Sequence, residues 1–463
     1  MSEALQWGGR FASAPDAALL AYGSSLVDDL AVAGHDVRCS RAHVAGLLDG
    51  GIVGAGEAGV LDAALQQVAD EIDAGTFAAW ATARAFEDVH GAIDARVREI
   101  AGPAGDRLHS GRSRNDQVAT TMLLFVREQA TRGAALAFET AALCANRASE
   151  ELERGTIVAA TTHWQPAQPI LLALWIDAVA RGFVRAGERF ARVASEAQRF
   201  SPLGSAALAG STLPLGRERS ASQLGFDAPS QNSLDAVGDR DLLLDFVDAC
   251  MRAVLTASRP SEELVVWATP AFGYVRLDDA ASTGSSLMPQ KRNPDPFELI
   301  RGAAGSLIGA SAGAAASVKG LALSYHRDLQ QTKSIVIRAA QDALAALAAF
   351  GPAFAHVRFQ AETMERAAGA GYTVATDLAD AMIARGATAR EAHHAVGERV
   401  RLAEAAGRDL DASDLAQLEI PGAPLDARAS VAAKRTLGST HPDQVAAAIA
   451  ATRAAIAAAK ELS

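Results

Sequence analysis

Small, hydroxyl-bearing residues at positions 282–286 (STGSS) are followed closely by two cations and an amide at Lys291, Arg292 and Asn293. The glycine at 284 permits unusual backbone angles, and exposed N–H groups in such a loop can bind an anion or an oxyanion. The two cations add positive charge at the same place. The segment is therefore a candidate for stabilising a developing negative charge. On composition alone, it is equally well an ordinary polar loop before a helix that opens near residues 294–297.

A second polar segment, residues 107–117 (RLHSGRSRNDQ), stands just ahead of a long stretch without proline. Guanidinium groups such as that of Arg112 and the N-terminus of a helix both favour anions, so the segment is a candidate carboxylate clamp. The alternative is that Asn115 or Asp116 simply caps the helix. The residue types leave both interpretations open.

His163 lies among threonines and glutamines in residues 161–169 (TTHWQPAQP), ahead of another helical stretch. A histidine in that setting can act as an acid or a base near neutral pH, although a single histidine more often has a structural role. Residues 87–90 (EDVH) and 325–333 (YHRDLQQTK) would each, taken alone, be interpreted as solvated helix faces. Only the histidine segment therefore suggests proton transfer by itself.

Whole-chain composition narrows the chemistry further. The formal net charge of −11 argues against a general nucleic-acid binder or a partner of anionic membranes. Three scattered cysteines without metal-ligand spacing indicate reduced thiols in a cytoplasmic protein, and the first ten residues show no secretory pattern. The sequence shows neither a metal-ligand constellation nor a glycine-rich phosphate loop after a strand. We therefore expect acid–base chemistry with electrostatic stabilisation, without a metal or a cofactor.

The elements that must hold these groups are predicted to be helices. Aromatic residues make up only 5% of the chain and alanine is abundant, which favours close-packed helices over sheets. Proline is absent from residues 104–165, 230–259 and 297–351, as long uninterrupted helices require, and a further helix is expected after Pro169. Residues 302–318, rich in Ala, Gly and Ser, are expected to form a buried helix. No alternation convincing enough for a sheet is present.

We predict an all-α protein of three helical domains. These are an N-terminal domain (1–112), a central long-helix bundle (113–361) and a C-terminal domain (362–463). Helices of roughly thirty residues or more cannot be covered by one small core, which suggests a bundle shared between subunits.

Taken together and in this order, the segments resemble argininosuccinate lyase, a family in the superfamily that also contains fumarase, aspartase and adenylosuccinate lyase. Residues 284–293 (GSSLMPQKRN) look like the superfamily signature. The resemblance to the argininosuccinate lyase branch rests on residues 7–11 (WGGRF), 87–90, 109–117, 232–237 (NSLDAV) and 375–380 (ATDLAD). The similarity runs from about residue 7 to at least residue 396, which is nearly the whole chain.

The resemblance implies an elimination that releases fumarate and arginine through an aci-carboxylate carbanion, without a metal or cofactor. It implies that Ser285 and His163 are the acid–base pair, that Lys291 stabilises the anion and that Glu298 orients the histidine; which of the pair is acid and which is base stays open. Positions that hold the dicarboxylate substrate in the family match Ser25, Arg112, Asn115, Thr162, Asn293, Tyr325, Gln330 and Lys333. Ser24 beside Ser25 makes that one position less certain.

The family also implies a homotetramer in which each site draws its segments from three subunits. This agrees with the separate expectation that the long helices need partners. A loop that closes over the substrate is implied as well, with Gly284 as its hinge.

Several positions depart from the family pattern without removing a proposed catalytic group. Thr161, Trp164 and Pro166 replace the usual Tyr, Leu and Arg around the histidine, and residues 326–331 (HRDLQQ) replace a usual NKDLQE. These departures bear on the leaving group more than on the elimination. Two alternatives therefore stay open: a lyase for another N-substituted aspartate, such as an amine or diamine adduct of fumarate, and a non-enzymatic structural protein like the lens crystallins. A fumarase-like hydratase fits less well.

Overall fold

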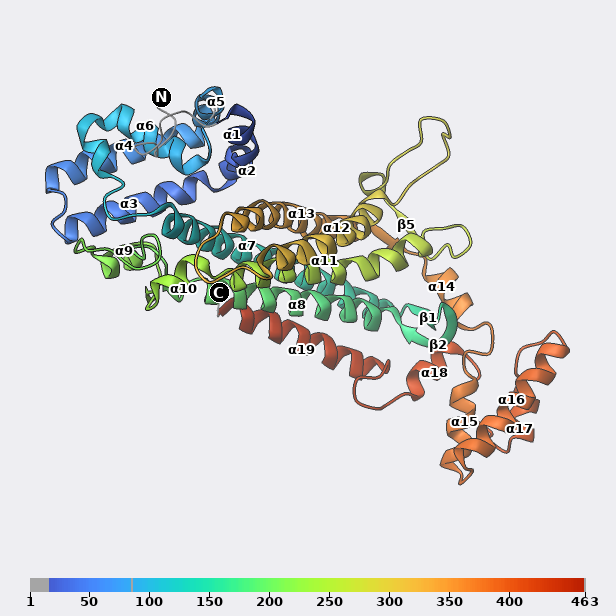
Figure 1. Cartoon of the computed structure of the whole chain (residues 1–463). Coiled ribbons are helices and arrows are strands. Elements are labelled where there is room, and N and C mark those ends of the chain that lie inside the picture. The colour runs from blue at the N-terminus through green and yellow to red at the C-terminus, as the bar shows by residue number, and fades with distance from the viewer. Residues whose placement is uncertain (1–15, 85, 462–463) are drawn as a thin grey trace. The chain divides into compact units, whose positions relative to one another are not determined.

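The computed structural model describes residues 16–84 and 86–461, and these are predominantly helical, which confirms the expected all-α class (Figure 1). The predicted motif at residues 7–11 lies outside the described residues. The helices are α1 (Ala17–Gly23), α2 (Leu26–Asp29), α3 (Ala33–Asp49), α4 (Ala55–Asp73), α5 (Thr76–Ala83), α6 (Val89–Ala101), α7 (Arg114–Arg154), α8 (Leu172–Glu196), α9 (Arg217–Gln223), α10 (Ser233–Gly238), α11 (Asp241–Trp267), α12 (Asp295–Val318), α13 (Gln330–Ala355), α14 (Ala361–Ala368), α15 (Ala375–Ala384), α16 (Ala389–Ala405), α17 (Ala412–Gln417), α18 (Ala427–Ala433) and α19 (Pro442–Glu461).

The chain divides into two compact units, each assembled from three stretches of sequence. Unit 1 comprises Met1–Ala134, Arg189–Arg252 and Gly305–Leu344, and unit 2 comprises Ala135–Glu188, Ala253–Ala304 and Ala345–Ser463. Every boundary falls inside one of the long helices α7, α8, α11, α12 and α13. The division into three helical domains stays a prediction.

Unit 1 contains a helical layer in which α3 contacts α4 and α9, and α4 contacts α6. Its core includes Leu124, Leu203 and Phe226, all buried. The turn after α3 packs so closely on the following chain that a Cβ at Gly50 would lie 1.8 Å from the carbonyl oxygen of Pro214. Glycine is therefore required at this position, because no side chain fits there.

Unit 2 is held by aromatic contacts between its long helices. The rings of Phe183 and Phe350 lie 4.8 Å apart, and those of Trp175 and Trp267 lie at the same centroid distance. Such offset ring pairs stabilise a core beyond the apolar area they bury. A separate apolar cluster, which includes Leu378 and Leu415, joins the helices near the C-terminal end.

The expectation of no sheet is wrong for three two-stranded pairings. Strands β1 (Ile157–Thr162) and β2 (Gln165–Leu171) form an antiparallel hairpin, β3 (Phe200–Ser201) pairs in parallel with β4 (Ala228–Pro229), and β5 (Val275–Leu277) pairs in antiparallel with β6 (Val357–Phe359). These strands are too short for an alternating pattern to be visible, and prolines interrupt β2. The long helix expected directly after Pro169 begins instead at Leu172, after the second strand.

Two helices pass through prolines that were expected to bound them. Pro260 lies inside α11 and Pro352 lies inside α13. A proline removes one backbone donor from a helix, but packing along a long helix can maintain the helix around it. The proline-free stretches therefore located these helices correctly and underestimated their length.

The expectation that residues 302–318 form a buried helix is confirmed for the face that contains Ala304, Leu307 and Ala314 and is wrong for the opposite face within the single chain. Leu299 and Ile308 on α12 are 73% and 50% exposed, and a Cβ at Gly302, Gly305 or Gly309 would meet nothing within 4 Å. The sequence pattern of small residues is that of a packed helix, but the described part of this chain does not cover that face.

Two helical stretches, residues 17–49 and 327–355, are long and apolar enough to cross a membrane by length and composition alone. Core helices of globular proteins pass the same test, and 56% of the relevant window in the second stretch is buried. The expected absence of a membrane partner stays a prediction. The three cysteines, Cys39, Cys144 and Cys250, are all buried and free, as expected.

Candidate active site

Ser25 and Lys333, two predicted substrate-binding residues from distant parts of the sequence, lie together in unit 1. The Lys333 ammonium is 3.3 Å from the Ser25 hydroxyl and forms an ion pair of 2.6 Å with the fully buried Asp29. The Ser25 hydroxyl in turn donates to Asp29 over 2.7 Å. The neighbouring Ser24 instead donates to backbone carbonyls at Phe86 and Glu87. Ser25 is therefore the serine that faces the lysine.

Gln330 and Arg327 link the start of α13 to the end of α1. The Gln330 amide donates to the carbonyl of Gly23 over 3.1 Å, and Arg327 donates to the same carbonyl over 2.7 Å. Arg327 also forms an ion pair of 2.7 Å with Glu87. Arg327 is one of the departures from the family pattern, and it holds the segment around Ser25 in place.

The segment at 112–117 caps α7, and its role as a carboxylate clamp stays a prediction. Ser113 and Asp116 cap α7 reciprocally: the Asn115 N–H donates to the Ser113 hydroxyl, and the Ser113 N–H donates to Asp116. The Asn115 side chain remains at the surface and donates to the carbonyl of Ala207. The Arg112 guanidinium is buried, 6% exposed, and donates to the Ser40 hydroxyl over 2.9 Å. The side chain that is predicted to bind a carboxylate is therefore buried in this chain.

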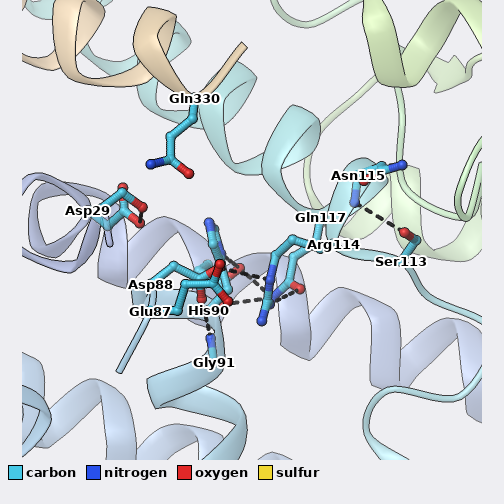
Figure 2. Close-up of polar contacts among 12 residues, drawn as sticks. Asp29, Glu87, Asp88, His90, Gly91, Ser113, Arg114, Asn115, Gln117 and Gln330 are labelled. Atoms are coloured by element: carbon cyan, nitrogen blue, oxygen red, sulfur yellow. Dashed lines mark hydrogen bonds and ion pairs between the residues drawn. The ribbon is translucent and has the colours of Figure 1, made fainter. Parts of the chain in front are cut away.

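Arg114, which was not among the predicted site residues, is held beside Asn115 by a buried network (Figure 2). Its guanidinium pairs with Asp88 over 3.1 Å and donates to Gln117 over 2.8 Å. The Gln117 amide donates to Asp36, which is wholly buried. Asp88 and Gln117 therefore fix the orientation of the Arg114 guanidinium. A guanidinium must be oriented in this way to bind a carboxylate in a single geometry.

The interpretation of residues 87–90 as a solvated helix face is wrong. Asp88 caps α6 by accepting from the Gly91 N–H over 2.6 Å (Figure 2). His90 is 1% exposed, and its Nδ1 lies 2.8 Å from Asp36. Burial raises the pKa of Asp36. The charge of His90 and the hydrogen bonds that Asp36 accepts outweigh this effect and hold the pKa of Asp36 well below its usual range. Four residues are too few to show a buried helix face in a sequence. Neither the start of α6 nor the buried pair of His90 and Asp36 could therefore be predicted.

Two histidines near Arg112 are kept neutral. Burial lowers the pKa of His109 to about 4, and the charge of Arg112 adds to this effect. Burial likewise lowers the pKa of His43 well below its ordinary value, and its Nε2 lies 3.0 Å from the carbonyl of Ser110. These side chains therefore take part in packing at neutral pH and do not carry charge there.

Tyr325 lies half-buried in unit 1 ahead of the short turn that starts α13. Burial raises the pKa of its phenol, while the charges of Arg327 and Arg240 oppose that rise. The predicted substrate-binding residues of unit 1 are therefore Ser25, Arg112, Asn115, Tyr325, Gln330 and Lys333. The remaining six predicted site residues belong to unit 2.

His163 is at the tip of the β1–β2 hairpin and not at the end of a long helix as expected. It and Trp164 form a two-residue turn between the strands, and both have left-handed backbones, with φ of 54° and 61°. Such turns match the twist of paired strands but are favourable mainly for Gly, Asn or Asp. The hairpin therefore presents His163, with Thr162 before it, as exposed side chains held in a strained turn.

The loop from 284 to 292 is closed at its base by paired backbone bonds between Thr283 and Asn293, of 3.2 Å and 2.9 Å. Inside this loop the hydroxyl of Ser285 accepts from the backbone N–H groups of Leu287 and Met288, over 3.2 Å and 3.0 Å. Two N–H dipoles therefore point at the one oxygen on which a negative charge would develop if Ser285 acted as a base.

The cations at the end of this loop differ in their surroundings. Arg292 forms an ion pair of 2.6 Å with Asp279, whereas the side chain of Lys291 is exposed and has no hydrogen bond or ion pair among the described residues. Glu298, in the first turn of α12, lies 4.0 Å from Arg301, and no hydrogen bond joins it to His163 in the part of the chain that the structure describes. The orienting role of Glu298 stays a prediction.

The partners Asp29, Asp36 and Arg114 were not identified from the sequence. Asp29 and Asp36 carry no motif of their own, and only the fold shows that they contact Lys333 and Gln117. Arg114 lies within the segment 107–117, but the family resemblance points to Arg112 as the arginine that holds the substrate. No group of three or more His, Cys, Asp or Glu with the geometry of a metal site occurs among the described residues.

A family model described as lyase matches residues 9–309, and one described as argininosuccinate lyase C-terminal matches residues 372–433. The first match covers more than half of the chain, so this protein belongs to the lyase family of the fumarase/aspartase superfamily. Within that superfamily the chain is argininosuccinate lyase-like, because its C-terminal segment matches that branch.

Solved structures agree with this assignment. EDDS lyase in complex with formate is 25% identical, with 96% of this chain and 89% of that chain covered and a TM-score of 0.81. An EDDS lyase variant with bound fumarate is also 25% identical, covers 96% of this chain and 91% of its own, and has a TM-score of 0.78. The 3-carboxy-cis,cis-muconate lactonizing enzyme from Pseudomonas putida, at 18% identity, 95% and 98% coverage and a TM-score of 0.74, shares the fold.

Proposed function

We propose that this protein is a carbon–nitrogen lyase that eliminates fumarate from argininosuccinate and leaves arginine. The proposal is supported by the family match, by the argininosuccinate lyase-like C-terminal segment and by the residues at 284–293. The reaction is reversible, needs no cofactor and belongs to arginine biosynthesis in the cytoplasm.

One observation carries the proposal: the Ser285 hydroxyl accepts two backbone N–H bonds within an exposed loop. A serine is too weak an acid to remove a proton from carbon unless its anion is stabilised, and aligned N–H dipoles do this without rearrangement. The ionised oxygen of Ser285 takes the proton from the carbon beside a carboxylate and becomes a hydroxyl, and the electron pair of the broken carbon–hydrogen bond moves onto that carboxylate as an aci-carboxylate. Lys291 and Asn293, at the end of the same loop, stabilise the added negative charge.

Departure of the nitrogen completes the reaction. The electron pair returns from the aci-carboxylate to form the carbon–carbon double bond of fumarate, the carbon–nitrogen bond breaks, and the nitrogen receives a proton. His163 is the group that exchanges this proton, since it is exposed at the hairpin tip and can bind or release a proton near neutral pH. In the reverse direction the two residues exchange roles.

We further propose that the active form is a homotetramer with sites shared between subunits. The support is the exposed face of α12, where Leu299 and Ile308 are accompanied by glycines with open space around them. The glycines permit close helix–helix approach, and the large exposed apolar side chains beside them mark an interface.

A second candidate function is a lyase for a different N-substituted aspartate. The likeness to EDDS lyase over 96% of this chain favours it, as do the departures at Trp164, Pro166 and His326. The two candidates share the elimination and differ only in the amine that leaves.

Fumarate release, followed by its ultraviolet absorbance, distinguishes these possibilities with the purified full chain. We expect turnover of argininosuccinate and a loss of at least about a thousandfold in Ser285→Ala with unchanged thermal unfolding. The matched variant Ser286→Ala, in the same loop, should keep most of the activity. Turnover of other N-substituted aspartates but not of argininosuccinate would establish the second candidate. Release of fumarate from no adduct would favour the crystallin-like alternative.

A further inference from the structure

Asp116, in the first turn of α7, has a second set of contacts besides the helix cap. Its side chain is fully buried, and one carboxylate oxygen accepts from the Ser113 N–H, which is the capping contact. The other oxygen accepts from two backbone N–H groups 88 and 90 residues away, those of Gly204 and Ala206, both over 2.9 Å. Capping requires only one oxygen, so the second set of contacts calls for a separate explanation.

The turn that Asp116 contacts has an unusual backbone. Gly204 and Ala206 have positive φ angles of 87° and 54°, and only glycine adopts such angles without strain. Two N–H groups that converge on one acceptor in such a turn favour an anion. Burial raises the pKa of Asp116 to about 6, while these N–H groups and the charge of Arg112 oppose the rise, so the carboxyl is ionised at pH 7.5. The carboxylate of Asp116 is therefore the anion that stabilises the strained turn.

Arg217, the first residue of α9, supports the same turn. Its Nε donates to the carbonyl of Leu203 and its Nη2 donates to the Ser205 hydroxyl, both over 3.2 Å. A Cβ at Gly204 would lie 2.7 Å from the Cγ of Arg217, so the apolar stem of the arginine packs directly on the turn. The turn is thus held by a carboxylate of α7 and a guanidinium of α9, all within unit 1.

The turn leads directly to a contact with Asn115, a predicted substrate-binding residue. The carbonyl of Ala207, the next residue after Ala206, accepts from the side-chain amide of Asn115 over 2.9 Å. The amide nitrogen carries two hydrogens, so this bond uses one and leaves the second, together with the amide oxygen, for a substrate. Because the amide can rotate about its terminal bond, the position of the Ala207 carbonyl determines where these remaining groups point.

We propose that Asp116 is a positioning residue for substrate binding, because it holds the turn at 204–207 that orients the Asn115 amide. The inference rests on the proposed lyase function, in which Asn115 binds the dicarboxylate. Asp116 contacts no reacting atom and acts only through Asn115. Its loss should therefore weaken binding of the substrate and leave the elimination step intact.

Steady-state kinetics of fumarate release from argininosuccinate, with the full chain, test this role. Asp116→Asn keeps one acceptor oxygen, which cannot serve both the cap and the turn. We expect KM to rise about tenfold and kcat to stay within about threefold, as loss of one hydrogen bond to a charged group predicts. Arg217→Met keeps an apolar stem on the turn but loses both donors, so KM should rise about threefold. The dissociation constant of fumarate, measured by calorimetry, should rise in the same proportions.

A double variant separates positioning from a loss of packing. Asn115→Ala alone should also raise KM, and the addition of Asp116→Asn should raise it by no more than about twofold beyond that, because Asp116 acts through Asn115. Asp414→Asn is the matched control. Asp414 is 1% exposed and accepts from the Asp411 N–H in the first turn of α17, which is the same local role that Asp116 has in α7. This control should lower the free energy of unfolding but change neither KM nor the dissociation constant of fumarate.

Three results would overturn the inference. These are an unchanged KM in Asp116→Asn, a loss in the double variant that equals the product of the two single losses, and an equal rise of KM in Asp414→Asn. If Asp116→Asn does not fold, Arg217→Met and its combination with Asn115→Ala decide in the same way. If only another N-substituted aspartate is turned over, its KM takes the place of that of argininosuccinate.

Fumarate binding distinguishes failure of this inference from failure of the proposed function, since it requires no turnover. Fumarate binding that weakens in Asp116→Asn, without fumarate release from any adduct, would refute the proposed function and support the positioning role. Fumarate release and fumarate binding that are both independent of Asp116 would refute the positioning role and leave the proposed elimination intact. A wild-type chain that neither binds nor releases fumarate would refute both.

Discussion

Individual charged side chains at the candidate site are fixed by partners buried behind them. Lys333 is held by Asp29, and Arg114 is held through Gln117 by Asp36. A side chain held in this way loses little conformational freedom when it binds a substrate, so more of the interaction energy is retained. The motif residues supply the contact, and the buried carboxylates determine the direction in which the cations point.

The backbone N–H that Leu287 donates to Ser285 leads to a prediction about Leu287, whose side chain takes no part in the proposed reaction. Leu287→Pro removes the N–H that now donates to the Ser285 hydroxyl, and the Leu287 side chain is 83% exposed, so packing is little affected. We expect kcat to fall by about 10- to 100-fold, because one donor to a developing anion is lost. Leu287→Ala keeps the N–H and should retain activity close to that of the wild type. Equal activity of the two variants in the fumarate assay would show that this donor does not stabilise the anion.

The chemically active residues could be found from the sequence only where a motif carried them. Ser285, Lys291 and Asn293 lie within ten positions of one another, so their spacing was visible. Asp29 could not be found, because its contact with Lys333 joins positions some three hundred residues apart.

Among the elements, the long helices were predictable and the hairpin was not. Apolar periodicity and the absence of proline extend over the 41 residues of α7, which makes the helical signal strong. The β1–β2 hairpin is short, contains two prolines and turns through two residues that rarely adopt left-handed backbones. In this hairpin, tertiary packing overrides the local backbone preferences of the residues in the turn. His163 is one of these turn residues.

The turn at Trp164 predicts an unusual order of stability between two variants. Trp164→Gly and Trp164→Ala both remove the indole, but only glycine adopts the left-handed backbone without steric penalty. We therefore expect the glycine variant to be more stable than the alanine variant by about 1 kcal/mol in the free energy of unfolding. Denaturant unfolding of both proteins measures the difference. The usual order, with alanine more stable, would mean that the turn is not strained in solution.

The junction of α3, α6 and α7 predicts how stability depends on pH. The pKa of His109 is about 4 in the folded protein, below its ordinary value of 6.5, so the unfolded chain takes up a proton between these values before the folded one does. The contribution of His109 to stability is therefore complete above about pH 6.5 and is lost as the pH drops towards 4, by about 1–2 kcal/mol at pH 5, whereas Asp116, whose pKa burial raises to about 6, changes stability in the opposite direction. Urea midpoints at pH 7.5 and pH 5 measure the fall, and His109→Gln should reduce it. The exposed His394→Gln should leave it unchanged, and an equal effect of both variants would contradict the assignment.

For the whole molecule, the exposed face of α12 predicts an obligate assembly. Ile308→Arg places a charge on that face, so the proposed tetramer should dissociate and fumarate release should be lost with it, because in the proposed assembly each site takes segments from several subunits. Leu437→Arg places the same charge on a side chain that is already 96% exposed and should change neither property. Light scattering coupled to size-exclusion chromatography gives the mass of each variant. An active monomer would refute the shared site.

The interleaving of the two units has a consequence for how the protein is made. Unit 1 includes Gly305–Leu344 and unit 2 includes Ala345–Ser463, so a ribosome finishes unit 1 only after it has produced two of the three stretches of unit 2. Neither unit can fold to completion as an independent domain while the nascent chain is still short, and apolar surfaces on α7 and α8 must wait for later partners. Splitting the gene at any of these boundaries would cut a long helix and separate stretches that belong to one core. Apolar surface of both units therefore stays exposed on the unfinished chain until late in translation.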